Sequence, residues 1–213
     1  RALLLAGISH DLRTPLSRLR LELEMAQLPE VSRAAMVGDI EQMDAIVRQF
    51  LDYARTAPQA PAAEVDLSAA VTTAVQRARI DAEPDSSVHL HIAPDVRIRG
   101  FATEIDRALD NLLTNAVRYG RDSETGQLHV TVSLTANAAH ATVAVIDRGS
   151  GVFVAEIDRL LRPFERGESA RSGSTGAGLG LPIVDRIARM HAGSLRLLPN
   201  SPRGLRAEMT IAR

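Results

Sequence analysis

The stretch Ser9–Leu16 reads SHDLRTPL and places an imidazole, a carboxylate, a hydroxyl and a proline within two helical turns. Apolar residues recur every three or four positions around it, which predicts a helix over residues 1–27. They are Ile8, Leu12, Leu16, Leu19, Leu23 and Ala26. Because Pro15 cannot donate a backbone hydrogen bond, we expect the helix to bend beside His10 and to expose its imidazole.

A second helix is predicted after a break at residues 28–30 and ends near Arg55. Its apolar positions repeat the same spacing at Ile40, Met43, Val47, Phe50 and Ala54. Residues 1–57 are therefore predicted to form an antiparallel helical hairpin. Since one hairpin cannot cover both of its apolar faces, we expect two copies to pair as a four-helix bundle, which makes the protein a homodimer.

The stretch TAPQAPAAE, residues 56–64, is rich in proline and alanine and shows no periodicity. It predicts a linker over residues 58–63 and a second domain over residues 64–213. Helical patterns in that domain cover 67–79, with Asp66 as a cap, and 104–118, 154–161 and 179–191. Strand patterns cover 88–92, 96–99, 127–135, 141–146, 194–198 and 205–211. This order predicts an α+β fold, an α/β sandwich whose mixed sheet carries helices on one face.

Composition excludes several classes of protein and site. The formal net charge is −1, so no general attraction to nucleic acid or anionic membrane is expected. There is no cysteine, which excludes disulfides, thiolate metal sites and a cysteine nucleophile. All 25 basic residues are arginine. Without lysine, the chain can be neither a P-loop nucleotidase nor a eukaryotic-type protein kinase.

No apolar run approaches the roughly 18 residues that a membrane-spanning helix needs. The chain begins at Arg1, without methionine and already inside a helical pattern. We therefore expect it to be a fragment of a longer protein.

Three stretches of the second domain favour nucleotide binding. In Asn111–Gly120 (NLLTNAVRYG), Asn111 and Asn115 project from one side of a helix, and an amide oxygen is a suitable ligand for Mg²⁺. Arg118 adds positive charge for phosphates. Two surface asparagines would give the same pattern, so the stretch alone leaves both interpretations open.

The second stretch, Val145–Val152 (VIDRGSGV), ends a strand with Asp147 and follows it with two glycines. A carboxylate there could accept a hydrogen bond from an exocyclic amine and so select adenine over guanine. A solvated turn is the alternative. In the third stretch, Gly173–Val184 (GSTGAGLGLPIV), a glycine loop leads into a helix, whose N-terminal N–H groups can hold phosphate. A flexible linker is the alternative for this loop.

Together these residues resemble the catalytic core of a bacterial two-component sensor histidine kinase, most closely the osmosensor class that partners a winged-helix response regulator. SHDLRTPL is similar to the phosphoacceptor box, NLLTNAVRYG to the asparagine box, and DRGSG to the first glycine box. RPFERG is similar to the phenylalanine box and GAGLGL to the second glycine box. All five occur in the order that the family has.

The resemblance implies that His10 is phosphorylated by Mg-ATP, with Asp11 as the base that readies the imidazole. Thr14 would help to position water for dephosphorylation of the partner, the receiver domain of a response regulator. It implies a homodimer with the histidine kinase/Hsp90-like ATPase fold. It also implies a cytoplasmic fragment of an inner-membrane sensor, attached to the membrane only through a missing upstream segment.

The same resemblance assigns the nucleotide site. Asn115 would bind Mg²⁺; Asn111, Arg118 and Tyr119 would flank the phosphates; Asp147 would hold the adenine amine. The pocket would be shaped by Gly149 and Gly151. Phe164 would anchor a lid over about 165–176, whose far side holds the remaining ATP-binding residues Gly176, Gly178, Leu179, Gly180 and Leu181.

Two other functions share some of these features. An ATP-binding clamp or chaperone-like ATPase has the same nucleotide fold, but lacks a hairpin that carries a histidine such as His10. A non-catalytic dimerisation scaffold would not need Asn115, Asp147 or the glycine loop. The other histidines match nothing in the family. His89 and His91 share one strand face and could bind metal, but surface or packing roles are favoured for them.

Overall fold

The computed structural model describes residues 2–26, 29–54, 58, 60–80, 85–165 and 177–213, with side chains from Thr14 onward apart from Asp52. The chain separates into two compact units, one formed mainly by residues 1–57 and the other mainly by residues 58–213.

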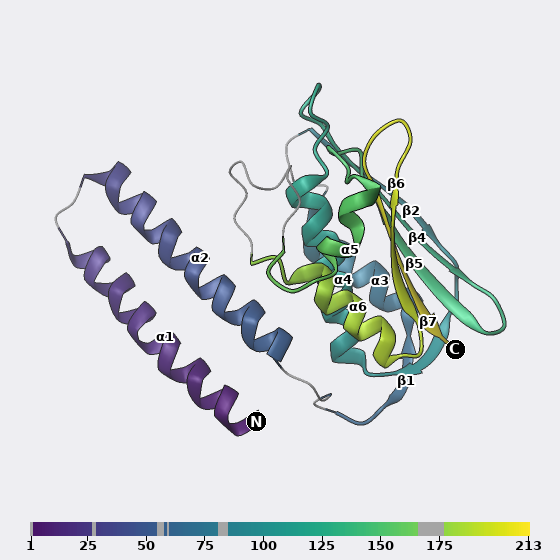
Figure 1. Cartoon of the computed structure of the whole chain (residues 1–213), viewed down its shortest axis with the longest axis horizontal. Helices are drawn as coiled ribbons and strands as arrows, with labels where there is room; N and C mark the ends of the chain where they lie inside the picture. The colour runs from purple at the N-terminus through teal and green to yellow at the C-terminus, as the bar shows by residue number, and fades with distance from the viewer. Residues whose placement is uncertain (1, 27–28, 55–57, 59, 81–84, 166–176) are drawn as a thin grey trace. The chain divides into compact units, whose positions relative to one another are not determined.

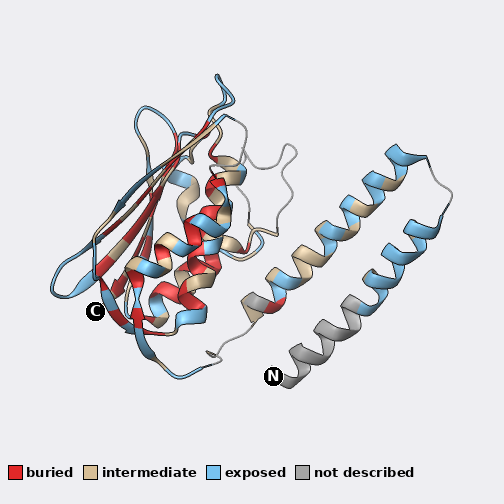
Figure 2. Ribbon diagram, turned by 180° about the vertical axis from the view of Figure 1, so that it is seen from behind, coloured by how far each residue is buried: buried red, intermediate tan, exposed pale blue. Residues whose placement is uncertain are grey.

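The first unit is the predicted helical hairpin, made of α1 (Ala2–Met25) and α2 (Glu30–Ala54) (Figure 1). Helix α1 is continuous around Pro15. An ion pair of 3.4 Å between Arg20 and Glu41 links the two helices. Among the described side chains of the hairpin, only Leu51 is buried, and Figure 2 shows exposed or half-buried residues along both helices.

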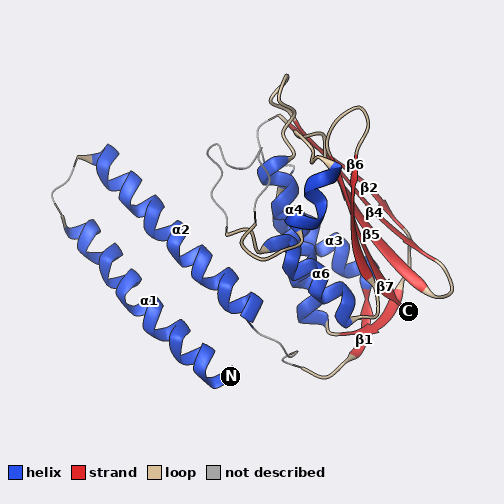
Figure 3. Ribbon diagram, in the orientation of Figure 1, coloured by secondary structure: helices blue, strands red, loops and turns tan. Residues whose placement is uncertain are grey.

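The second unit is built on a five-stranded mixed sheet with the order β2-β4-β5-β7-β6 (Figure 3). The strands are β2 (Ser86–Ile92), β4 (Leu128–Ala136), β5 (His140–Ile146), β7 (Leu205–Ala212) and β6 (Ser194–Pro199). Only the β2–β4 pair is parallel among these neighbours. The mixed sheet predicted from the sequence is therefore confirmed.

Three helices cover one face of this sheet: α3 (Leu67–Ala78), α4 (Ala102–Tyr119) and α6 (Gly180–Met190). Burial alternates along β4 and β7, because successive side chains of a strand point to opposite faces of the sheet and every second one faces the helices. Figure 2 shows the buried residues on the sheet and on the helices that cover it. On α4 the buried residues include all those predicted from periodicity, namely Ile105, Leu109, Leu112, Leu113 and Ala116. The apolar core thus lies between the sheet and α3, α4 and α6.

A second, two-stranded sheet differs from the sequence-based prediction of a single sheet. It pairs β1 (Ala63–Asp66) with β3 (Arg97–Gly100) in antiparallel fashion and joins the buried residues Val65 and Ile98. Strand β1 begins where the linker was predicted to end. The cap of α3 is confirmed, because Asp66 accepts a hydrogen bond of 2.9 Å from the Ala69 amide.

The helix predicted over 154–161 is a shorter composite. A 3₁₀ turn, η2 (Val154–Glu156), leads into the single-turn helix α5 (Ile157–Leu160). In the described part of the chain, no helix combines the length and the apolarity that a membrane crossing requires.

Candidate functional site

Helix α4 presents the predicted asparagines beside its buried face. Asn111 and Asn115 are half-buried, one turn apart, and the more C-terminal Arg118 is exposed. Asn111 Nδ2 donates to the Arg107 carbonyl at 2.8 Å. Its Oδ1 lies only 3.2 Å from the position that a Cβ on Gly180 would take. Asn111 therefore faces the first residue of α6, and a side chain at position 180 would crowd it.

Asp147 directly follows β5 and is buried, with 5% of its surface exposed. Its Oδ1 accepts hydrogen bonds from the Gly149 amide at 2.9 Å and from the Leu205 amide at 3.1 Å. Burial raises the pKa of the Asp147 carboxyl, and these two backbone donors oppose the rise. A carboxylate held in this way is a buried hydrogen-bond acceptor with fixed orientation, and the solvated turn considered from the sequence is excluded.

Close backbone packing joins Asp147 to the end of α4. A Cβ on Gly149 would lie 1.9 Å from the Tyr119 carbonyl oxygen, and a Cβ on Gly120 would lie 2.7 Å from Asp147 Cβ. Neither distance is compatible with a side chain. The structure therefore brings together the asparagine stretch and the aspartate stretch, and the half-buried Tyr119 lies at their junction.

The turn between β6 and β7 also packs against the candidate site, and this was not predicted from the sequence. Gly151 has a φ of +72°, and a Cβ there would lie 2.8 Å from the Gly204 carbonyl oxygen. Gly204 itself packs against Asp147, because its Cβ would lie 2.0 Å from the Asp147 carbonyl oxygen. The sequence signal for this contact is limited to Gly204 in the stretch Arg203–Arg206.

The predicted lid is described only at its two ends. Phe164 is exposed and has a φ of +66°. Gly176 and residues 166–175 lie outside the described residues. At the far end Gly178 has a φ of +67°, Leu179 is buried, and Gly180 opens α6 with the half-buried Leu181 next to it.

The phosphoacceptor stretch lies on α1. His10 and Asp11 belong to this helix, but their side chains lie outside the described part of the structure. Thr14, four residues after His10, is exposed.

The remaining histidines separate into structural and surface residues. His191 is buried, its Nδ1 donates to the Ile187 carbonyl at 2.8 Å, and its Nε2 accepts from the Phe101 amide at 3.0 Å. His89 and His91 are exposed on β2. Within the described residues, no group of three or more His, Asp or Glu side chains is placed to hold a metal ion.

Comparison with known families gives two matches. Residues 1–59 match the His Kinase A (phospho-acceptor) domain. Residues 100–213 match the family described as histidine kinase-, DNA gyrase B- and HSP90-like ATPase.

Comparison with curated proteins gives sensor kinases. The chain is 37% identical over 205 residues to the sensor protein RstB of Escherichia coli, covering 90% of this chain and 44% of RstB. It is 32% identical over 204 residues to the sensor-type histidine kinase PrrB of Mycobacterium tuberculosis, covering 92% of this chain and 44% of PrrB. The chain thus spans less than half the length of these relatives.

Solved structures agree on the fold. The mycobacterial sensor histidine kinase MprB superposes with a TM-score of 0.62 at 26% identity, covering 70% of this chain and 97% of that one. Full-length ShkA in complex with AMPPNP gives a TM-score of 0.76 at 22% identity, covering 99% of this chain and 46% of that one.

Proposed function

Because the chain belongs to the sensor histidine kinase family, we propose that it is the kinase core that transfers the γ-phosphoryl group of ATP to His10. The observation that carries this proposal is the convergence of the end of α4, the loop after β5 and the start of β7 on the buried Asp147, whose carboxylate the last two bond. A dedicated acceptor of this kind suits the amine of adenine, and the phosphoacceptor domain supplies the histidine.

We assign Asp147 to the exocyclic amine of adenine. Its carboxylate is oriented by two backbone donors on the same oxygen, so the other oxygen is the one that meets the base. Gly149 and Gly151 lack the side chains that would collide with neighbouring backbone, which keeps the chain close around the base. An acceptor at this point favours adenine over a purine with a 6-oxo group, since a carbonyl oxygen cannot donate.

We assign the phosphate end of the site to α4. Asn115 supplies an amide oxygen for Mg²⁺, and one protein ligand fits this ion because Mg²⁺ keeps water and phosphate oxygens around it. Bound there, Mg²⁺ would neutralise phosphate charge. Asn111, Arg118 and Tyr119 flank the phosphates, with Arg118 exposed on the last turn of the helix.

The reaction is an in-line displacement at phosphorus. A ring nitrogen of neutral His10 forms the new N–P bond while the bond between the γ-phosphorus and the bridging oxygen breaks, and ADP leaves. Asp11 holds the imidazole by a hydrogen bond at the other ring nitrogen and takes its proton. No lysine is required, which agrees with its absence from the chain.

We propose that the lid predicted over about 165–176, of which residues 166–176 lie outside the described residues, closes over the nucleotide. Phe164 stands at one end; Gly176, Gly178, Leu179, Gly180 and Leu181 stand at the other. Gly178 has a φ of +67°, which suits glycine, and the conformational freedom of glycine is what a hinge at that end needs.

Dimerisation is proposed through the hairpin. Its helices leave Leu19, Met43 and Phe50 between 39% and 53% exposed, and all three belong to the apolar stripes. A second copy would cover them as a four-helix bundle. Light scattering should give a dimer that Phe50→Glu dissociates and that Arg18→Gln, at an exposed position off the stripes, does not. A monomeric wild type would contradict this assembly.

Phosphoryl transfer to an aspartate of a response regulator, and removal of that group, complete the proposal. Thr14 is exposed on α1 and is separated from His10 by one helical turn, which suits a role in positioning water. Thr14→Ala should therefore slow dephosphorylation of the regulator more than it slows autophosphorylation. Equal losses in the two reactions would refute this role.

Incubation of the chain with γ-labelled ATP and Mg²⁺ tests the kinase activity itself. We expect acid-labile, base-stable label on His10. Nucleotide binding without any label would contradict the proposal.

A further inference from the structure

The turn between β6 and β7 holds the backbone of Asp147 on both sides. Asn200 Nδ2 donates to the Asp147 carbonyl oxygen at 2.8 Å, and the Asp147 amide donates to the Leu205 carbonyl at 2.9 Å. With both of its backbone groups bonded, the direction in which the Asp147 side chain leaves the backbone is fixed. The Leu205 amide then bonds the carboxylate itself.

From this geometry we infer that Asn200 is a positioning residue that makes the site selective for a 6-amino purine. Asn200 bonds the Asp147 carbonyl from a turn 53 residues further along the chain. It acts through Asp147 and does not itself touch the base. This role rests on the proposed function, because it requires Asp147 to receive the exocyclic amine.

The turn does not need the Asn200 side chain to form. Its backbone closes through the Asn200 amide and the Gly204 carbonyl at 3.0 Å, and Pro199 pairs with Leu205 in the flanking strands. The side-chain amide is therefore available for Asp147. Loss of the Asn200 side-chain amide should make the orientation of the Asp147 carboxylate less fixed, while the hairpin between β6 and β7 stays in place.

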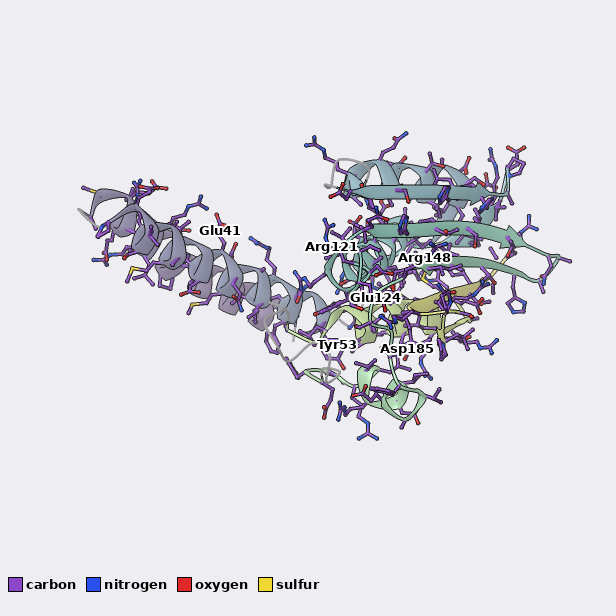
Figure 4. The ribbon with its side chains drawn as sticks, turned by 90° about the horizontal axis from the view of Figure 1, so that it is seen from above. Glu41, Tyr53, Arg121, Glu124, Arg148 and Asp185 are labelled. Carbon is purple, nitrogen blue, oxygen red and sulfur yellow. The ribbon has the colours of Figure 1, made fainter. Side chains whose placement is uncertain are left out.

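Two matched control positions are available. Arg203 belongs to the same turn but contacts Ser123 at 2.8 Å and Glu124 at 3.0 Å in the loop after α4, where Figure 4 labels Glu124. Asn137 is an asparagine of the same sheet whose Oδ1 accepts from the Ala139 and His140 amides in the turn between β4 and β5. Neither contacts Asp147 through these bonds.

The test compares ATP with inosine triphosphate, which carries a 6-oxo group in place of the 6-amino group. Both dissociation constants are measured by calorimetry, with Mg²⁺, on the same preparation of each variant. Unfolded protein in a preparation does not bind and affects both nucleotides alike, so the ratio of the two constants reports selectivity alone.

We expect the wild type to prefer ATP and Asn200→Ala to reduce that preference about threefold to tenfold, through weaker ATP binding with nearly unchanged binding of inosine triphosphate. Asn200→Asp keeps the shape but removes the donor, and should reduce the preference as well. Arg203→Ala and Asn137→Ala should keep the wild-type ratio.

Equal weakening of both nucleotides in Asn200→Ala, or an unchanged ratio, would overturn the role of Asn200 while leaving that of Asp147 intact. A wild type that binds both nucleotides equally would instead overturn the adenine contact of Asp147, and with it any positioning role for Asn200. The two failures are thus distinguished by the wild-type ratio.

Discussion

Leu205 donates its backbone N–H to Asp147 Oδ1 at 3.1 Å, although 58 residues separate the two in the chain. The first residue of β7 is thereby part of the candidate adenine site. Gly149 donates to the same oxygen from the loop after β5. The carboxylate is held by backbone groups alone at this oxygen, and such groups are retained when surrounding side chains are changed.

Asp147→Asn should separate nucleotide binding from folding. The amide oxygen can still accept from Gly149 and Leu205, so the fold should persist. The charge-assisted hydrogen bond to the adenine amine is lost, which should weaken ATP binding about tenfold or more. Calorimetric titration with ATP measures the change. ATP affinity equal to that of the wild type would contradict the assignment of Asp147.

The same variant should change how stability depends on pH. Burial raises the pKa of the folded Asp147 above the ordinary value of 3.8. The folded state therefore binds this proton more tightly than the unfolded chain does. Its contribution to the free energy of unfolding is fully present below pH 3.8 and is lost as pH rises through the folded pKa.

Asp147→Asn removes this proton, so the variant should gain stability relative to the wild type as pH rises from below 3.8 toward neutrality. Urea unfolding at a series of pH values measures the difference between the two proteins. A difference that stays constant with pH would show that the carboxyl does not carry the raised pKa.

Gly149→Ala tests the close contact between the loop after β5 and the end of α4. The added Cβ would lie 1.9 Å from the Tyr119 carbonyl oxygen, so we expect a loss of about 2–4 kcal/mol in unfolding free energy. Gly126→Ala is the control, with a φ of +72° and nothing within 4 Å. It should cost only the backbone strain, about 1–2 kcal/mol. Equal losses in the two variants would argue against the contact.

His191→Leu should destabilise the second unit without any direct effect on the nucleotide site. It leaves the Phe101 amide without its acceptor and removes the side-chain donor to the Ile187 carbonyl, so we expect a loss of about 2–4 kcal/mol. His89→Leu, at an exposed position of β2, should stay within about 0.5 kcal/mol of the wild type. Thermal or urea unfolding measures both. A His191 variant as stable as the His89 variant would contradict the structural role.

Elements with a strong internal pattern could be predicted from the sequence alone. Helix α4 is an example, since Ile105 and Leu109 mark a buried face with helical spacing and both are buried. The sheet strands β4 and β7 were predicted within one residue because their apolar residues alternate. Strand β1 was not predicted, since four residues carry too little pattern and Val65 is buried only by pairing with Ile98 across the small sheet.

The residues of the candidate site also fall into two groups, those predicted from sequence pattern and those found only through tertiary contacts. Asn111, Asn115 and Asp147 lie in stretches whose residue types and spacing indicate their chemistry. Asn200 and Leu205 could not be found, because they act through contacts 53 and 58 residues from Asp147. The Leu205 contact also uses backbone atoms, which no residue type encodes. Tertiary structure was needed to show that β7 contacts Asp147 of the candidate site.

We propose that ATP bound at Asp147 phosphorylates His10. The most direct test of this proposal is incorporation of label from γ-labelled ATP into the wild type, His10→Gln and Asp147→Asn. We predict acid-labile, base-stable label in the wild type only, with ATP binding retained in His10→Gln and weakened in Asp147→Asn. Label that survives in His10→Gln would contradict the account.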